Sequence, residues 1–364
     1  MNAPALTVRA IRTTAVEVPM KHVLGTSQAV VRSAPLLLVD LETEEGITGR
    51  AWLFCYVPAA AAAIASLMAE VERVVKGEPV APGALAAKLQ KRFTLIGVQG
   101  VVRMAMSGFD VACWDALAIA AGQPLARYLG GVPRPIRAYN SNGLGLMAPA
   151  RLADEAEELL AGGFGALKLR LGHATLAEDL AALDAVRKRI PEGVHIMVDY
   201  NQALSVAEAL HRGRALDAAG VYWLEEPVRH DDYEGNARLA RELATPVQIG
   251  ENFSHPTAMQ SALAAGACDY VMPDLERIGG VTGWMRAAAI ASAHGVEMST
   301  HLFPEVSAHL MAVTPTAHWL EYVDWAAPIL REPMAIVDGH AVIPERPGHG
   351  MAWDEEAVER YRMR

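Results

Sequence analysis

Three acidic residues, Asp199, Glu225 and Glu251, each close a short apolar run in the chain. If these runs are neighbouring strands, the three carboxylates converge and repel one another unless a hard divalent cation lies among them. Oxygen ligands, with no cysteine and little histidine nearby, favour Mg²⁺ over zinc. The alternative is that each acid only caps the helix after it, which is common for Asp and less so for Glu.

The residues next to these acids leave two points open. Because a strand alternates its faces, we expect only one of Glu225 and Glu226 to point inward with the other acids. Asn201 and Asn252 either donate hydrogen bonds to the carboxylates or serve as turn residues.

Two cations, Lys168 and Arg170, lie on either side of Leu169. In a strand both point to the same face. Two cations aimed into a barrel mouth favour an anion, which a substrate carboxylate would supply. The alternative is a solvated basic pair, which the apolar neighbours Ala166, Leu167 and Leu169 disfavour.

An acid and a histidine, Asp274 and His301, end two further strand candidates that follow each other in the chain. Adjacent strands place the carboxylate beside the imidazole, where it fixes the tautomer and raises the basicity of the ring. This dyad suits a general base. Glu321 closes the next strand among apolar residues, so we expect burial to raise its pKa and leave a neutral acid that can donate to an oxyanion.

The same residues indicate the fold, because eight successive apolar strand candidates each end at a polar residue. The ends lie near Ser141, Arg170, Asp199, Glu225, Glu251, Asp274, His301 and Glu321, and the last six are 20 to 27 residues apart. Such intervals hold one helix each, which predicts parallel crossovers and a modified (β/α) TIM-type barrel of the α/β class. Active sites of such barrels lie at the carboxyl ends of the strands.

The barrel is expected over residues 133–330, between two other segments. Residues 1–132 read as an α+β capping domain, with a buried strand at 34–41, a turn at 45–49 and helices at 59–76 and 101–121. Residues 331–364 hold Pro333, Pro344 and Pro347 among short apolar runs. We expect this segment to pack back on the capping domain and complete it.

The composition narrows the function classes. With 364 residues and 52% hydrophobic residues the chain can bury a large core, and a net charge of −10 disfavours nucleic acid and membrane surfaces as partners. Cys55, Cys113 and Cys268 suggest no disulfide framework, and the first residues lack the pattern of a signal peptide. We therefore expect a cytoplasmic protein.

Several stretches of the chain together resemble the mandelate racemase / muconate lactonizing enzyme family of the enolase superfamily. They are 198–202, 223–227, 250–252, 272–274, 278–284, 299–303 and 317–321. The resemblance implies a capping domain on a modified barrel and Mg²⁺-assisted removal of a proton next to a carboxylate.

The resemblance also implies roles for single residues. It makes Asp199, Glu225 and Glu251 the metal ligands, Lys168 and Glu321 the residues that stabilise an enediolate, and Asp274 with His301 a dyad. Ser141 and Asn201 match polar neighbours of the substrate or metal, and Phe54 and Tyr56 match aromatic positions of an apolar substrate pocket. Met20–Arg32 corresponds to a flap over the site, although its residues agree poorly. Family analogy suggests a homo-oligomer, an octamer or a dimer.

One departure from mandelate racemase concerns its second lysine, which is Arg170 in this chain. A racemase needs a base on each face of the substrate. Arginine has a reference pKa of about 12.5, so removing its proton at pH 7 costs on the order of 7 kcal/mol. Lysine shifts its pKa more readily. We expect symmetric racemisation to be impaired.

Three functions remain open at this point. The leading interpretation is a mandelate racemase-like isomerase that forms an enediolate from a 2-hydroxy acid. The alternative is an acid-sugar (aldonate or aldarate) dehydratase, a hydro-lyase, that uses the His301–Asp274 dyad as its single base while Arg170 orients the carboxylate. A third is an inactive ligand-binding barrel.

Overall fold

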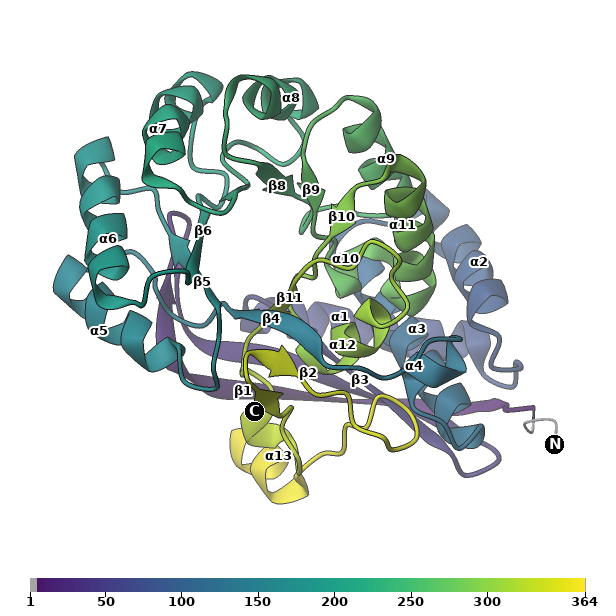
Figure 1. Ribbon diagram of the computed structural model, residues 1–364. Coiled ribbons are helices and arrows are strands. Elements are labelled where there is room, and N and C mark those ends of the chain that lie inside the picture. The colour runs from purple at the N-terminus through teal and green to yellow at the C-terminus, as the bar shows by residue number, and fades with distance from the viewer. Residues whose placement is uncertain (1–4, 364) are drawn as a thin grey trace.

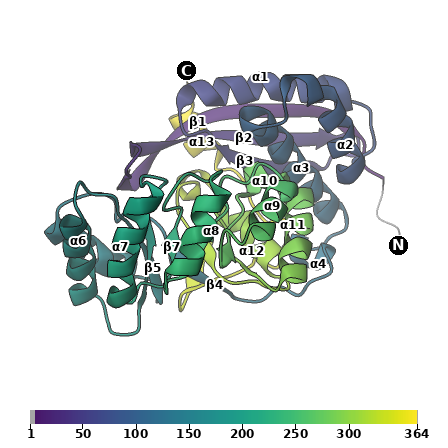
Figure 2. The ribbon, with the colours of Figure 1, turned by 90° about the horizontal axis from the view of Figure 1, so that it is seen from above.

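The structure, a computed structural model, describes residues 5–363 and consists of a capping unit and a barrel that lie against each other (Figures 1 and 2). The expected domains 1–132 and 331–364 begin and end at residues 1 and 364, which lie outside the described residues. None of the helices within 5–363 has the length and apolar character that crossing a bilayer demands.

The capping unit is an antiparallel sheet of β1 (Val8–Gly25), β2 (Val30–Thr43) and β3 (Thr48–Phe54), in that order. Residues 34–39 of β2 are all buried, because both faces of this central strand are covered. The helices are α1 (Pro58–Val75), α2 (Pro82–Phe93), α3 (Gly100–Ala120) and α4 (Leu125–Tyr128), with the 3-10 turn η1 (Thr94–Ile96). The strand and the two helices predicted here are confirmed.

The barrel contains the eight parallel strands that the sequence predicts. They are β4 (Ile136–Asn140), β5 (Ala166–Arg170), β6 (His195–Asp199), β7 (Leu224–Glu225), β8 (Val247–Ile249), β9 (Tyr270–Val271), β10 (Glu297–Met298) and β11 (Leu320–Tyr322). The helices between and after the strands are α5 (Pro149–Leu159), α6 (Leu176–Arg189), α7 (Val206–Ala219), α8 (Tyr233–Glu242), α9 (Pro256–Ala264), α10 (Leu275–Ile278), α11 (Gly280–His294) and α12 (Pro304–Met311).

Neighbouring strands follow the chain from β4 to β10, and β11 pairs with β4. The ring closes between β10 and the residues just before β11, where Met298 forms a parallel bridge with Ala317. Each strand is short, so the residues that follow it turn at once into the mouth of the barrel. This arrangement brings polar residues from distant parts of the chain to one end.

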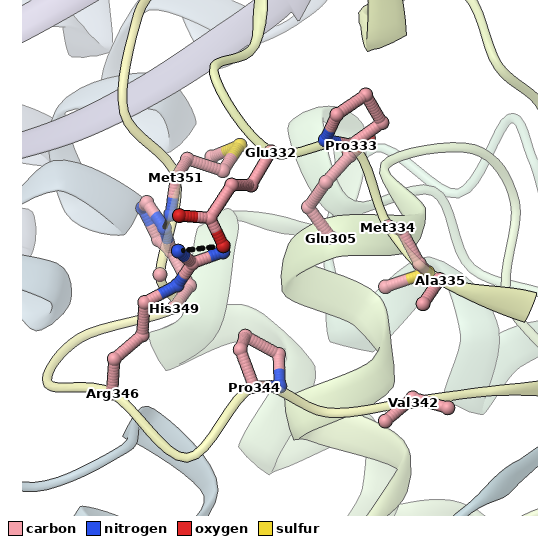
Figure 3. Close-up of a pocket in the computed structure, with 11 residues that line it drawn as sticks. Glu305, Glu332, Pro333, Met334, Ala335, Val342, Pro344, Arg346, His349 and Met351 are labelled. Carbon is pink, nitrogen blue, oxygen red and sulfur yellow. Dashed lines mark hydrogen bonds and ion pairs between the residues drawn. The ribbon is translucent and has the colours of Figure 1, made fainter.

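After β11 the chain continues into η2 (Ala327–Ile329), β12 (Ile336–Val337), β13 (His340–Ala341) and α13 (Glu355–Tyr361). This segment contacts both units: β13 pairs with β4 of the barrel, while Trp353 Nε1 donates to Asp40 of β2. A cavity of about 170 Å³ lies between this segment and α12. Figure 3 shows the residues that line it, among them Arg346 and Glu332, which form an ion pair of 2.5 Å.

We predict that Gly49→Ala destabilises the capping unit. A Cβ at Gly49 would overlap the backbone oxygen of Ala112 in α3 and come within 2.9 Å of the Ala116 Cβ. Overpacking of this kind costs about 1–3 kcal/mol, and the midpoint of thermal unfolding should fall. Gly83→Ala is the matched control, because Gly83 in α2 is exposed with open space around its Cα. An equal loss in both variants would contradict the close β3–α3 packing.

Candidate active site

A cavity of about 210 Å³ lies at the mouth of the barrel, beneath the hairpin of β1 and β2. Nine of the site residues expected from the sequence line it: Phe54, Tyr56, Lys168, Arg170, Asp199, Asn201, Glu251, His301 and Glu321. The other three, Ser141, Glu225 and Asp274, are fully buried and hydrogen-bonded to residues of this wall. The structure therefore brings all twelve to one place.

The carboxylates at the ends of β6 and β7 lie side by side, because Asp199 and Glu225 are register partners. Lys168 lies between them: its Nζ is 2.6 Å from Glu225 Oε1 and 3.6 Å from Asp199 Oδ2. Burial, the charge of Asp199 and that of Glu321 raise the pKa of Glu225 to about 8 against the opposing effect of Lys168. With Glu321 at 2.7 Å, three carboxylates therefore lie within 4 Å of Lys168 Nζ.

The third acid, Glu251, follows β8 and belongs to the same cluster, because its charge contributes to raising the pKa of Asp199. Its Oε2 lies 3.2 Å from Nε2 of His301. As the side chains stand, no three His, Cys, Asp or Glu residues within 5–363 form a ready metal-binding group. The reason is that Asp199 and Glu225 turn to Lys168 while Glu251 turns to His301.

Asn201 and Asn252 support these acids in the way expected, and Asn201 also has turn geometry. Asn201 has a φ of 45°, and both its backbone N–H and its amide Nδ2 donate to the Asp199 carboxylate. Asn252 Nδ2 donates to Glu226 and to Glu251. Asn201 is therefore both a turn residue and a hydrogen-bond donor to Asp199.

The expectation that only one of Glu225 and Glu226 points inward is wrong. Both side chains are buried. Glu226 lies near Glu251, because the Nδ2 of Asn252 donates to both carboxylates. The physical reason is that β7 ends at Glu225 and Glu226 has a φ of 35°, so the alternation of a strand no longer applies. Burial and the charges of Glu251 and Asp199 raise the pKa of Glu226 well above its usual value.

His301 and Asp274 form a buried hydrogen-bonded pair, with 2.6 Å between Nδ1 and Oδ2. The chain segments form a parallel bridge at these two residues. Burial disfavours the charged ring, but Glu251, Glu321 and the hydrogen bond to Asp274 outweigh burial and raise the pKa of His301 well above its usual value. Since Asp274 holds Nδ1, the other ring nitrogen, Nε2, faces Glu251 and the cavity.

The expectation of a neutral Glu321 is wrong. Burial does favour the neutral acid, but Lys168 and His301 outweigh burial and lower the pKa of Glu321 to about 2. Lys168 Nζ lies 2.7 Å from Oε1, and Oε2 accepts from the backbone N–H of Leu302. The apolar neighbours in the sequence gave no sign of these cations, which come from other strands.

Arg170 is held firmly on the β4 side of the cavity. Its Nη1 donates to the backbone oxygens of Ser141 and Gly143, and its Nη2 donates to Ser141 Oγ. Ser141 in turn donates to Glu321. The buried Nε of Arg170 has no hydrogen-bond partner in the described part of the chain, so this N–H of the guanidinium stays unpaired.

The hairpin tip that corresponds to the expected flap lies against the barrel mouth. Ser27 Oγ donates to the backbone oxygen of Tyr200, and Gln28 Nε2 donates to that of Asn201. Apolar residues of this hairpin and of both units form one wall of the cavity. They are Leu24, Ala29, Val31, Phe54, Leu302 and Trp325, with the Phe54 and Trp325 rings 4.9 Å apart.

Two contributors to the site were missed from the sequence. Arg277 contacts the backbone oxygen of Glu251 and the side chain of Asn252, and Trp223 Nε1 donates to Glu225 Oε2. Trp223 could have been found, because it lies two residues before Glu225 on the same side of the strand. Arg277 lies in the short helix α10, where the sequence shows no pattern that separates it from a surface arginine.

Comparisons with known proteins show the family to which the chain belongs. Residues 8–130 match the family described as mandelate racemase / muconate lactonizing enzyme, N-terminal domain, and residues 151–357 match the family described as enolase C-terminal domain-like. L-talarate/galactarate dehydratase of Salmonella typhimurium is 29% identical over 336 residues, which are 92% of this chain and 84% of that protein.

Two solved structures superpose on at least 98% of the chain. An enolase from the alphaproteobacterium BAL199 with bound magnesium has a TM-score of 0.96 and 47% identity, over 98% of this chain and 100% of that chain. An enolase from Bradyrhizobium, complexed with magnesium and mandelic acid, has a TM-score of 0.95 and 39% identity over 100% of both chains. The chain therefore belongs to the mandelate racemase / muconate lactonizing enzyme family of the enolase superfamily.

Proposed function

We propose that this protein is an Mg²⁺-dependent enzyme that removes the α-proton of a 2-hydroxy acid with an apolar or aromatic side chain, in the manner of a mandelate racemase. The observation that carries the proposal is the meeting of the acidic cluster, Lys168 and the His301–Asp274 pair around one cavity with an apolar wall.

Asp199, Glu225 and Glu251 fit a magnesium ion by the chemistry of their donors. They are oxygen ligands only, and their mutual repulsion at the mouth favours a divalent cation. Binding requires these carboxylates to turn from Lys168 and His301 toward a common point. Mg²⁺ held there supplies positive charge to the substrate carboxylate and makes the adjacent C–H bond more acidic.

His301 is the base in this proposal. Asp274 fixes its Nδ1, so the Nε2 that faces the cavity accepts the α-proton. The raised pKa of the ring, to which the charge of Glu251 contributes most, favours its protonated form. His301 accepts a proton only in its neutral form, which would be favoured once the Glu251 carboxylate turns away from the ring. Removal of the proton leaves negative charge on the substrate carboxylate and the α-carbon.

Lys168 and Arg170 stabilise that charge. Burial opposes the Lys168 ammonium, but Glu225, Glu321 and Asp199 raise its pKa, so it stays a cation and a hydrogen-bond donor inside the site. Arg170 lines the cavity, and its Nε has no partner among the described residues, which supports a role as donor to the substrate carboxylate. Glu321 orders both cations, Lys168 directly and Arg170 through Ser141.

The apolar wall supports a substrate with an apolar side chain. Phe54, Leu302 and Trp325 give the cavity apolar surface, beside the polar side chains of Thr26, Gln28 and Gln202 that also line it. Burying an aliphatic or phenyl group against the apolar residues is favourable, whereas the hydroxyl groups of a sugar acid would need the polar ones as partners. The mandelic acid found in the Bradyrhizobium relative points to the same class.

A second candidate is dehydration of an acid sugar, which the arginine at position 170 favours. Dehydration needs one base, and His301 can take the α-proton and then protonate the departing β-hydroxyl on the same face. NMR in D₂O with Mg²⁺ and a panel of 2-hydroxy acids and aldarates separates the cases. Inversion identifies a racemase, a keto-acid product identifies a dehydratase, and no exchange with any member favours an inactive binding barrel.

Replacing a proposed metal ligand should abolish magnesium binding. We expect Glu225→Gln to weaken Mg²⁺ binding at least about 100-fold, because even residues that only support ligands change metal affinity 10–100-fold. Isothermal titration calorimetry measures this directly. Glu297→Gln is the control, since Glu297 is exposed at the start of β10. Unchanged Mg²⁺ affinity in Glu225→Gln would count against the ligand set.

Replacing the proposed base should stop proton exchange. His301→Asn keeps a polar side chain but no general base, so α-deuterium incorporation should fall about 10²–10⁴-fold. Mg²⁺ binding should persist in this variant, as calorimetry can show. His294→Asn, at the exposed end of α11, should exchange at the normal rate. Exchange that survives in His301→Asn would mean that another group takes the proton.

A lysine at position 170 should supply the second base. β4 and β11 lie between β5 and β10, so Arg170 and His301 approach the cavity from different sides. We expect Arg170→Lys to increase racemisation, measured by chiral chromatography of each enantiomer after incubation. Arg170→Met removes the charge without adding a base and should show no such gain. If Arg170→Lys racemises no faster, position 170 does not face the second side of the substrate.

A further inference from the structure

The short helix α10 connects the capping unit to the proposed base and to the acidic cluster. Asp274 caps this helix: its Oδ1 accepts from the backbone N–H groups of Glu276 and Arg277, while its Oδ2 holds His301. The buried Glu276 accepts from the backbone N–H of Phe54 at the end of β3. Figure 2 shows α10 next to the capping unit.

Arg277 makes the widest set of contacts in this helix. Its Nη1 donates to the backbone oxygen of Glu251 at 3.2 Å and to Asn252 Oδ1 at 2.7 Å. Its Nη2 donates to the hydroxyl of Tyr56, and the guanidinium lies 4.9 Å from the centroid of the Tyr56 ring. One side chain thus joins a residue of the capping unit to the loop after β8.

The contacts continue from Asn252 to the carboxylates. With its Oδ1 held by Arg277, the Asn252 amide directs its Nδ2 to the side chains of Glu226 and Glu251. Arg277 therefore fixes Glu251 at two points: its backbone carbonyl directly and its carboxylate through Asn252. Residues that orient metal ligands in this way typically alter metal affinity 10–100-fold.

We propose that Arg277, packed under Tyr56 of the capping unit, is a positioning residue that holds Glu251 in place. Through this contact the capping unit sets the affinity of the barrel for its divalent ion. This inference rests on the proposed function, because it takes Glu251 as a metal ligand.

The sign of the effect separates positioning from simple electrostatics. Arg277 is a cation 3.7 Å from Glu251 Oε1, so its charge opposes a divalent cation at the same carboxylate. If charge alone mattered, removing the guanidinium would tighten Mg²⁺ binding. If Arg277 positions Glu251, its removal weakens Mg²⁺ binding in spite of the lost repulsion.

The test is calorimetric titration of the purified full chain with Mg²⁺. We expect Arg277→Met and Tyr56→Ala each to raise the dissociation constant about tenfold or more. Arg277→Lys should stay weakened, because one ammonium cannot reproduce the fork that reaches Glu251, Asn252 and Tyr56 together. The control is Arg229→Met, whose exposed ion pair with Asp231 should leave the constant unchanged.

The remaining outcomes decide the proposal. Tighter or unchanged binding in Arg277→Met overturns it, and unchanged binding in Tyr56→Ala overturns the link to the capping unit. Tyr56 is 40% exposed, so its variant should fold even if Arg277→Met does not. A wild-type protein that binds no Mg²⁺ overturns the proposed function, whereas loss of binding in Glu225→Gln without any change in Arg277→Met overturns only the role of Arg277.

Discussion

The organisation of the barrel mouth depends on the compensation of buried negative charge. Five carboxylates are buried there, those of Asp199, Glu225, Glu226, Asp274 and Glu321, and the half-buried Glu251 lies beside them. An ionised carboxylate without partners inside a protein costs several kcal/mol, so each must meet a cation or several hydrogen-bond donors. Lys168, His301, Arg170 and Arg277 supply the cations, and asparagine amides and backbone N–H groups supply further donors. Lys168 and His301 are each shared by more than one of these carboxylates, which joins them into one network.

The barrel makes such a network possible because its strands fix where each charge can lie. In the register of β5, β6 and β7, Arg170 lies opposite Asp199 and Asp199 lies opposite Glu225. The capping unit contributes apolar residues to the cavity and contacts that cover the mouth of the barrel. One of these contacts is the hydrogen bond from Ser27 Oγ to the backbone oxygen of Tyr200. Rigid positions and a covered cavity are what electrostatic stabilisation of a developing charge requires.

The sequence predicted the strands and most of the site for one reason: a polar residue that closes an apolar run is visible without knowledge of the fold. What depends on neighbours from other strands was not visible. Glu321 looked like a neutral acid because Lys168 and His301 are distant in the chain. Glu226 was misjudged because its backbone leaves the strand conformation. Arg277 was missed because its partners come from the loop after β8 and from the capping unit.

The two sides of the cavity differ in what they can do with a proton, and this difference bears on the reaction. On one side His301 presents a ring nitrogen whose partner nitrogen is held by Asp274. On the other side the Arg170 guanidinium, which has donors only, donates to two carbonyl oxygens and a hydroxyl. A group fixed in this way donates hydrogen bonds but does not accept a proton. In our proposal the α-proton therefore leaves and returns on the His301 side, so that isotope exchange at the α-carbon outpaces inversion unless a solvent proton reaches the opposite face.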